Sequence, residues 1–539
     1  MRINKSLVLL PLASLLLTGC FFKFPTNFLP IEGSSSEEQS STKHSSSEKS
    51  SSEESSSEES SSSSSSSIEE KGFVKVKDMS MVCSDLNSSY APALGDVKML
   101  VIPIQFAGDT ANGYSNRISS WTQSRLDLLD SIYFGEEDSL KNYYDVASFG
   151  KMRMTGMVSD VYKNTTYSIA DILDDNSMNV LWDMMEDALD WVVESNPDID
   201  WSEYDVNNDG NLDNIHLITN YTSNKWAENL WPHMFYTRRP HTSEHLGIDV
   251  YSMSGIGFVT DFVTATHEQG HIFGLQDYYD YSDDGTSPID YIGHLDMQSH
   301  NVFDWNSFSK LSVGWVEPYV VTGEADVTTI TISAASLNGD CIIIPADYST
   351  WNGSAFDEYF LIELFSPYGN NTRDWDYYYN AIGSGGVRLY HVDARAYGSD
   401  VLDGYNPELL VVDDLEAQEI NSIDDISKFA YNTLGANNSS NWRDYEGGIE
   451  QLGNHPLLSI VQRGGEFTFA SKNQAVNHTL SVLDLFKNGH TFRFEDYSHF
   501  LNKDVTSTST MDNGEVFPYE ISFSNWSKEK ITVTITKVR

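Results

Sequence analysis

Between residues 33 and 67 the chain consists almost entirely of serine and glutamate. Such a stretch has no apolar side chains to bury, so we expect it to stay disordered and to act as a tether. As a flexible coil, a segment of this length spans about 30–35 Å. Any compact structure must therefore be built from the residues after Gly72, where the composition becomes that of a globular protein.

The start of the chain has the features of an export signal. A short basic beginning is followed by an apolar run over residues 7–17, which is too short for a membrane-spanning helix. The run ends in Leu-Thr-Gly-Cys at 17–20, which resembles the bacterial lipobox. This resemblance implies a signal peptide over 1–19 and a lipid on Cys20, followed by the tether up to residue 71. The alternative is an ordinary signal peptide that is cleaved nearby.

Charge and cysteine content exclude several classes of protein. The chain has 79 Asp and Glu against 33 Lys and Arg, which gives a net charge of −46. So negative a surface repels phosphate backbones, and we expect no nucleic-acid partner. The same carboxylates offer many oxygen ligands for hard cations. Three cysteines in 539 residues exclude a disulfide scaffold and a thiolate zinc cluster.

The part of the chain after Gly72 divides into two regions with different hydrophobic patterns. Residues 97–106 are almost continuously apolar and predict a buried strand, and apolar residues at helical spacing predict helices over 138–150, 178–193 and 257–275. From about residue 320, alternating runs bounded by Gly, Asn and Asp predict an antiparallel β region. These runs lie at 327–332, 359–364, 386–392 and 530–536. We predict an α+β fold with one domain over 72–320 and a β-rich region of one or two modules over 321–539.

One helical run carries a pattern that is typical of zinc enzymes. His267 and His271 are four residues apart, so both imidazoles lie on one helix face and can share one metal ion. Glu268 is rotated away from that face, and its carboxylate can reach an open coordination position. Gly274 can adopt a positive φ, end the helix and return the chain so that Asp277 supplies a third ligand. Two nitrogens and one oxygen leave a tetrahedral position for water, as in catalytic zinc sites.

This pattern predicts a hydrolytic mechanism. Zinc lowers the pKa of its bound water, and Glu268 serves as the general base. Tyr279 is a candidate donor to the oxyanion, but aromatic packing around the site is the favoured explanation of this residue. His294 and His300 are alternative ligands, but their spacing from the helix is less regular than that of Asp277. The competing explanation of the whole pattern is a pair of surface histidines on a helix.

The residues from His267 to Tyr279 resemble the zinc signature of the immune inhibitor A metallopeptidases, a family related to the metzincins in which aspartate is the third ligand. The segment 293–297, Gly-His-Leu-Asp-Met, is similar to the Met-turn of that clan and would place Met297 beneath the metal. Leu295 stands where the family usually has tryptophan. A looser likeness covers about residues 97–465, with matching segments at 101–106, 143–151, 308–315, 358–363 and 391–393.

The resemblance implies a metzincin-like zinc peptidase domain followed by an antiparallel, β-sandwich-like C-terminal region. It also implies a zinc-dependent endopeptidase, anchored at the bacterial cell surface through Cys20, that cleaves extracellular proteins or peptides. The alternatives are a surface adhesin or carbohydrate-binding protein on an inactive peptidase fold, and hydrolysis of a non-peptide bond. The intact Glu268 argues against a binding protein, which has no need of a general base. Cys83 is a free thiol, a thiolate that caps the zinc in a latent form, or a disulfide partner of Cys341.

A second metal site is predicted upstream. The sequence over 205–213 matches the first nine positions of a calcium loop, with the turning glycine at Gly210. Its candidate ligands are Asp205, Asn207, Asp209, Asn211 and Asp213. Position twelve, usually a bidentate glutamate, is His216 in a predicted strand over 215–218. We therefore expect a structural calcium with a further ligand from elsewhere rather than an EF-hand. The alternative is an Asn- and Asp-rich turn without metal, and 283–285 is a weaker candidate of the same kind.

Overall fold

The computed structural model describes residues 72–77, 79, 91–106, 114, 116–175, 177–206, 208–223, 228–237, 240, 245–258, 262–275, 277–278, 290–394, 396–397, 408–411, 418–419, 457–465, 468–469, 479–501, 510–511 and 513–539. The predicted signal peptide, Cys20 and the Ser/Glu tether lie outside these residues and stay predictions. Within the described part of the chain, no helix combines the length and the apolar character needed to cross a bilayer.

The N-terminal half is built on a mixed sheet with the strand order β3-β2-β5-β7-β6, and β4 also pairs with β2. Its strands are β2 (Gly95–Phe106), β3 (Met152–Val158), β4 (Tyr162–Asn164), β5 (Ile215–Thr219), β6 (His233–Tyr236) and β7 (Val250–Gly255). Neighbouring strands run parallel except β6, which pairs antiparallel with β7 and ends the strand order. The predicted strand over 97–106 is therefore confirmed as the core of β2.

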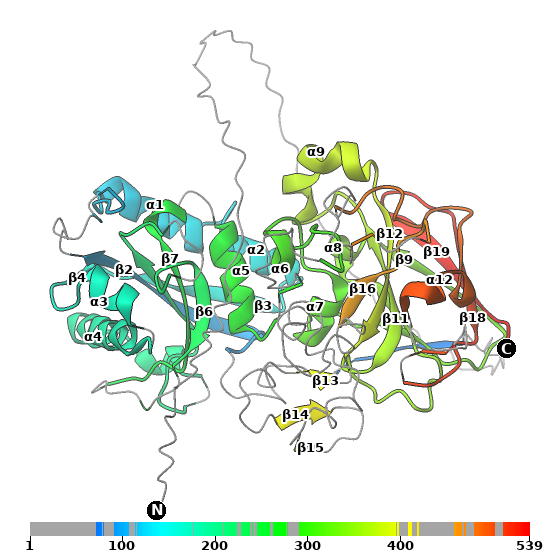
Figure 1. The fold of residues 1–539 in the computed structure, drawn as a ribbon, viewed down its shortest axis with the longest axis horizontal. Helices are drawn as coiled ribbons and strands as arrows, with labels where there is room; N and C mark the ends of the chain where they lie inside the picture. Colours follow the sequence, from blue (N-terminus) through cyan, green and yellow to red (C-terminus); the bar gives the residue numbers. More distant parts are fainter. Residues whose placement is uncertain are drawn as a thin grey trace, which may run out of the picture. The chain divides into compact units, whose positions relative to one another are not determined.

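Helices cover both faces of this sheet, which explains why β2 is a continuous apolar run (Figure 1). Alternate β2 side chains, such as Met99 and Val101, pack with α1 (Gln123–Phe134), α2 (Leu140–Ala147) and α5 (Val263–Ile272). The intervening side chains, such as Leu100 and Ile102, pack with α3 (Ile169–Asp174) and α4 (Asn179–Ser195). The sheet therefore holds α5, which carries the zinc-type pattern, against one of its faces.

The predicted helices are present with shifted ends. α2 begins after Ser139, whose hydroxyl accepts a hydrogen bond from the Asn142 amide at 3.0 Å. α4 matches the helix expected over 178–193. The helix expected over 257–275 is shorter, because a 3-10 turn, η3 (Ile256–Phe258), precedes α5 and α5 ends at Ile272. Another 3-10 turn, η2 (Trp201–Tyr204), follows α4.

The C-terminal half contains two main sheets, with strand orders β1-β8-β10-β11-β12-β16 and β17-β18-β19-β9. Their strands are β1 (Phe73–Lys75), β8 (Tyr319–Val321), β9 (Val327–Ser333), β10 (Cys341–Ile344), β11 (Glu358–Phe365), β12 (Gly386–Asp393), β16 (Leu458–Ile460), β17 (Thr491–Arg493), β18 (Tyr519–Ser524) and β19 (Lys530–Lys537). Side chains of both sheets form one apolar cluster. The four predicted strands of this region are confirmed within β9, β11, β12 and β19.

Smaller elements complete the described structure. The helices are α6 (Met297–His300), α7 (Ser307–Ser312), α8 (Ala335–Asn338), α9 (Asn371–Ile382) and α12 (Phe494–Leu501). A small sheet joins β13 (Ala396–Tyr397), β14 (Glu408–Val411) and β15 (Gln418–Glu419). The mixed α and β composition agrees with the predicted α+β class.

The predicted division at residue 320 falls inside a strand. β8 pairs antiparallel with β1, from the very start of the folded body, and parallel with β10. The C-terminal region is therefore not purely antiparallel, and one of its strands comes from residues 73–75. One apolar cluster also contains side chains from both sides of residue 320, such as Trp305 and Tyr390. These contacts join the two halves of the body, and the predicted domain division stays a prediction.

Candidate metal centre

The structure brings His267, His271 and Asp277 together in a buried cluster. The Asp277 Oδ1 atom lies 2.9 Å from His267 Nε2 and 3.4 Å from His271 Nε2, and the two Nε2 atoms are 3.1 Å apart. All three side chains are buried. Among the described residues, this is the one group of three or more His, Cys, Asp or Glu side chains whose ligand atoms are close enough to share an ion.

The local chain path produces this convergence. His267 and His271 project from the same face of α5, one turn apart. The helix ends at Ile272, and Gly274 adopts a φ of +90°. The amide of Leu275 returns to the carbonyl of Gly270 at 3.1 Å, which is the hydrogen bond of a glycine-terminated helix. The reversal predicted at Gly274 is therefore confirmed, and it returns Asp277 to the two imidazoles.

Backbone carbonyls orient both imidazole rings. His267 Nδ1 lies 2.8 Å from the Met297 carbonyl oxygen, and His271 Nδ1 lies 2.7 Å from that of Leu275. Because a carbonyl oxygen only accepts hydrogen bonds, each Nδ1 must be the donor, which directs each Nε2 toward Asp277. The cluster thus presents two nitrogen lone pairs and a carboxylate oxygen to one point, and these acceptors repel each other unless a proton or cation lies between them.

The electrostatics of the cluster reflect this arrangement. Burial favours neutral His271, but the Asp277 carboxylate outweighs burial and raises the pKa of His271 to about 9. Burial likewise disfavours charged Asp277, yet the two imidazoles hold the pKa of its carboxyl well below the usual range. Glu268 is buried one residue along the helix, and its charge also raises the pKa of His271. Positive charge is therefore strongly favoured at this point.

Helix α6 supports the cluster from the other side. Met297, at its start, is buried and supplies the carbonyl oxygen that orients His267. The next residue, Gln298, donates from Nε2 to the His267 carbonyl oxygen at 3.3 Å. A Cβ atom on Gly270 would lie only 2.2 Å from Gln298 Oε1. Glycine between the two histidines therefore lets α6 approach α5 closely.

A second support comes from the β-rich region, and sequence reasoning did not find it. Arg388 on β12 donates from Nη2 to the carbonyl oxygen of Leu295 at 2.7 Å. Its Nη1 atom lies 3.4 Å from Glu363 Oε1, and both side chains are buried. The other Glu363 oxygen accepts hydrogen bonds from the Ser307 amide and hydroxyl at 2.8 and 2.7 Å. The signal available in the sequence was one charged residue, Glu363 or Arg388, within each of two otherwise apolar predicted strands.

The alternative ligands His294 and His300 do not belong to this close group of ligand atoms. His294 Nδ1 lies 3.1 Å from Asp290 Oδ2, and the His294 ring lies 4.9 Å from that of His300. His300 itself is exposed. Tyr279, the candidate oxyanion donor, lies outside the described residues, as does the segment 283–285.

The predicted calcium loop is present as a compact turn whose carboxylates bind its own backbone. Asp205 accepts hydrogen bonds from the amides of Asp209 and Gly210, both at 3.0 Å, and Gly210 adopts a φ of +91°. Asp213 accepts from the Val206 amide at 2.8 Å, and burial raises the pKa of Asp213 to about 6. Asn207 lies outside the described residues. The calcium site stays a prediction.

The last residues of the predicted loop have other roles. Asn211 donates from Nδ2 to Asp249 Oδ2 at 2.9 Å. His216, at position twelve, is buried in β5 between Ser252 and Ser254, with ring-nitrogen to hydroxyl distances of 2.7 and 3.0 Å. It is therefore a core side chain and not a loop ligand, as the predicted strand required.

Of the cysteines singled out in the sequence, Cys341 is a buried free thiol in β10, and burial raises its pKa. Cys83, whose pairing or latency role was considered, lies outside the described residues.

No protein-family model matches this chain, and no curated protein matches it closely enough to be counted as a relative. The functional conclusion therefore depends on the geometry of the buried His–His–Asp cluster.

Proposed function

We propose that this chain is a cell-surface zinc endopeptidase of the metzincin-like type that cleaves extracellular proteins or peptides. One observation carries the proposal: the Nε2 atoms of His267 and His271 converge on Asp277 Oδ1 within 2.9–3.4 Å, in a buried site. Glu268 lies beside the cluster on the same helix.

The donor set fits zinc better than the other common cations. Two imidazole nitrogens and one carboxylate oxygen form a three-residue ligand set, which leaves one tetrahedral position open, as in catalytic zinc sites. Calcium and magnesium favour all-oxygen sets. The hydrogen bonds from both Nδ1 atoms to carbonyl oxygens are the outer-shell contacts that orient zinc-binding histidines. When bound, zinc acts as a Lewis acid and lowers the pKa of a bound water.

Named side chains of the site would bind the cation and transfer the proton. His267, His271 and Asp277 would hold the cation. Glu268 would accept a proton from the water that attacks the scissile carbonyl, and its carboxyl would later return the proton to the leaving amine. The C–N bond breaks as the amine leaves. Burial of Glu268 excludes bulk water and strengthens its electrostatic interactions at the site.

The sheet offers a means of holding an extended substrate. β6 is the last strand in the order and the antiparallel one, and α5 packs against both β6 and β7. An extended peptide can add to such a strand through main-chain hydrogen bonds, which aligns a peptide bond without requiring a particular sequence. In our proposal β6 serves this role beside the metal cluster.

The location and other partners belong to the same proposal. The lipobox-like start predicts export and a lipid on Cys20, so the membrane would be contacted through this lipid and the substrates would be extracellular. A structural calcium in the loop over 205–213 would stabilise the catalytic half. An inactive adhesin would not require a glutamate buried beside a three-ligand metal cluster, which favours the enzyme.

The test is casein hydrolysis by the purified full-length chain, together with its zinc content. We expect about one zinc per chain and activity that is lost with a chelator and restored by zinc. Glu268→Gln should keep the zinc but lower turnover by about 10²–10⁴-fold or more. His267→Ala should lose the zinc. The exposed Glu529→Gln, on the hairpin before β19, is the matched control and should behave as wild type. Retained turnover in Glu268→Gln would remove Glu268 from the mechanism.

A further inference from the structure

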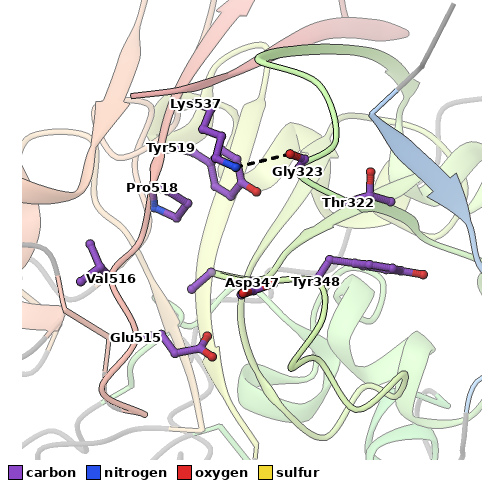
Figure 2. A pocket seen from close by; sticks show the side chains of 10 residues that line it. Thr322, Gly323, Asp347, Tyr348, Glu515, Val516, Pro518, Tyr519 and Lys537 are labelled. Atoms are coloured by element: carbon purple, nitrogen blue, oxygen red, sulfur yellow. Dashed lines mark hydrogen bonds between the residues drawn. The ribbon is translucent and has the colours of Figure 1, made fainter. Parts of the chain in front are cut away.

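A cavity of about 490 Å³ opens in the β-rich region, away from the metal cluster. We call it the β-region cavity. Its lining comes from the residues just after β8 and β10, from the segment that leads into β18, and from the end of β19. The lining residues used in the argument are Gly323, Asp347, Tyr348, Glu515, Tyr519 and Lys537 (Figure 2). A smaller hollow of about 130 Å³ shares Asp347 and Glu515 and adds Trp351. The larger volume is within the range of about 300–1,000 Å³ that is usual for small-molecule sites.

A tyrosine side chain presents its hydroxyl to the cavity. Tyr519 is only 5% exposed, and its hydroxyl forms no hydrogen bond with any residue that the structure describes. Its ring packs edge-on against Phe517, with centroids 5.5 Å apart. A Cβ atom on Gly323, which has a φ of +69°, would lie 2.6 Å from this hydroxyl. The hydroxyl is open to the cavity, so it can donate a hydrogen bond to a ligand there or accept one from it.

Two carboxylates lie across the cavity from Tyr519 and are held in place by short hydrogen bonds (Figure 2). Asp347 Oδ1 accepts from the Ser349 amide and hydroxyl, both at 2.8 Å. Glu515 Oε1 accepts from the Thr350 hydroxyl at 2.7 Å. A carboxylate has about four acceptor positions, so each group keeps lone pairs for a ligand. The cavity thus offers fixed hydrogen-bond acceptors.

A positively charged side chain also lines the cavity. Lys537 lines the same cavity, and its Nζ atom lies 3.5 Å from the Gly323 carbonyl oxygen (Figure 2). An ammonium group only donates hydrogen bonds, whereas Tyr519 both donates and accepts. A ligand that fills the cavity must therefore donate to Asp347 and Glu515 and accept from Lys537.

Two aromatic rings lie beside these polar groups. Tyr348 is 36% exposed and contributes to the cavity lining. Its ring centroid is 6.0 Å from that of Trp351, which lines the adjoining hollow, with an angle of 33° between the planes. An exposed aromatic ring such as that of Tyr348 provides apolar contact at small entropic cost, because the side chain has only two rotatable bonds.

We propose that the β-region cavity binds a neutral saccharide. The cavity holds side chains of both signs, so a ligand with a single charge would be attracted by one group and repelled by another. A neutral molecule rich in hydroxyl groups can donate to the carboxylates, accept from Lys537 and pair with Tyr519, while the C–H face of a sugar ring covers Tyr348. The site lies outside the proposed catalytic centre, so the β-rich region would bring the enzyme to glycan-bearing surfaces.

The test uses the purified full-length chain and three neutral probes: maltotriose, cellotriose and N,N′,N″-triacetylchitotriose. Saturation-transfer NMR detects binding, and calorimetry measures the Kd. We expect at least one probe to bind. Tyr519→Phe removes only the hydroxyl and should weaken that binding by about fivefold to tenfold, and Tyr348→Ala should weaken it as well. The matched control is Tyr379→Phe, which removes a phenol hydroxyl from a 49% exposed side chain on α9 and should leave the Kd unchanged.

Three outcomes would overturn the proposal. These are the absence of binding by all three neutral probes, a wild-type Kd in Tyr519→Phe, and tighter binding of charged probes such as Nα-acetyl-lysine amide or glucuronate. Because binding is measured directly, the result does not depend on peptidase activity. The saccharide site and the proposed enzyme can therefore fail independently.

Discussion

Arg388 on β12 donates a hydrogen bond from Nη2 to the carbonyl oxygen of Leu295, 2.7 Å away and 93 residues earlier in the chain. Leu295 lies two residues before Met297, whose own carbonyl orients His267. A charged side chain of the β-rich region thus contacts the segment whose backbone orients His267. The β-rich region is therefore part of the support of this cluster rather than a separate attachment.

Removal of this contact should weaken both the fold and the metal site. In Arg388→Ala, Glu363 loses its buried cationic partner, and breaking a buried pair costs about 3–5 kcal/mol of unfolding free energy. We also expect weaker zinc binding, since displaced outer-shell supports cost about 10–100-fold in metal affinity. Denaturant unfolding and competition with a chromophoric chelator measure the two effects. Arg153→Ala breaks an exposed pair with Asp96 and should change neither. Wild-type zinc affinity in a folded Arg388→Ala variant would contradict the expected link between the Arg388–Leu295 contact and zinc binding.

Gly270→Ala should be destabilising although alanine favours helices. The helix preference of alanine contributes up to about 1 kcal/mol, but the new Cβ would lie 2.2 Å from Oε1 of the buried Gln298. Overpacking of this kind costs about 1–3 kcal/mol. The net loss should appear in the unfolding free energy and in zinc affinity.

Two further variants identify the cause of this loss. Gly464→Ala is the control, because nothing lies within 4 Å of its Cβ position. Adding Gln298→Ala to Gly270→Ala should recover part of the lost stability by removing the clash. A double variant that is simply additive would show that the contact with Gln298 is not the cause.

Stability should fall in acid partly through His216. Burial lowers the pKa of His216 to about 3, against about 6.5 in the unfolded chain. The unfolded state therefore binds more protons between these values, so this stabilising contribution is complete above pH about 6.5 and is lost as the pH falls toward 3. His216→Gln, which cannot titrate, should flatten the dependence of unfolding free energy on pH over this window. An unchanged slope would mean that His216 does not carry this part of the acid response.

Calcium should raise the melting temperature if the loop over 205–213 binds it. A ligand that binds only the folded state stabilises it by about 2.7 kcal/mol at a hundredfold excess over Kd. Asp209→Ala should abolish the calcium-dependent shift, while Asp347→Ala, in the β-region cavity, should retain it. Calorimetry of the zinc-loaded protein with and without calcium is the measurement. Equal melting temperatures would favour an Asn- and Asp-rich turn without metal.

Much of the candidate site was predictable because its determinants are local. The spacing of His267 and His271 places both on one helix face, and Gly274 permits the reversal that returns Asp277 to them. Local spacing also identified the cores of β2, β11, β12 and β19. The helix over 257–275 was predicted too long, because apolar periodicity does not distinguish α5 from the η3 turn that precedes it.

Local sequence is enough to specify which residues can form the His–His–Asp cluster, since helix geometry and one glycine act within about ten residues. The contacts that hold and surround this cluster depend on tertiary packing. The contact of Arg388 with Leu295, the pairing of β1 with β8 and the opening lined by Tyr519 and Asp347 all join residues far apart in the chain. Such contacts depend on how sheets and helices pack, and no local pattern of side chains specifies which distant partner a buried charge or an edge strand will meet.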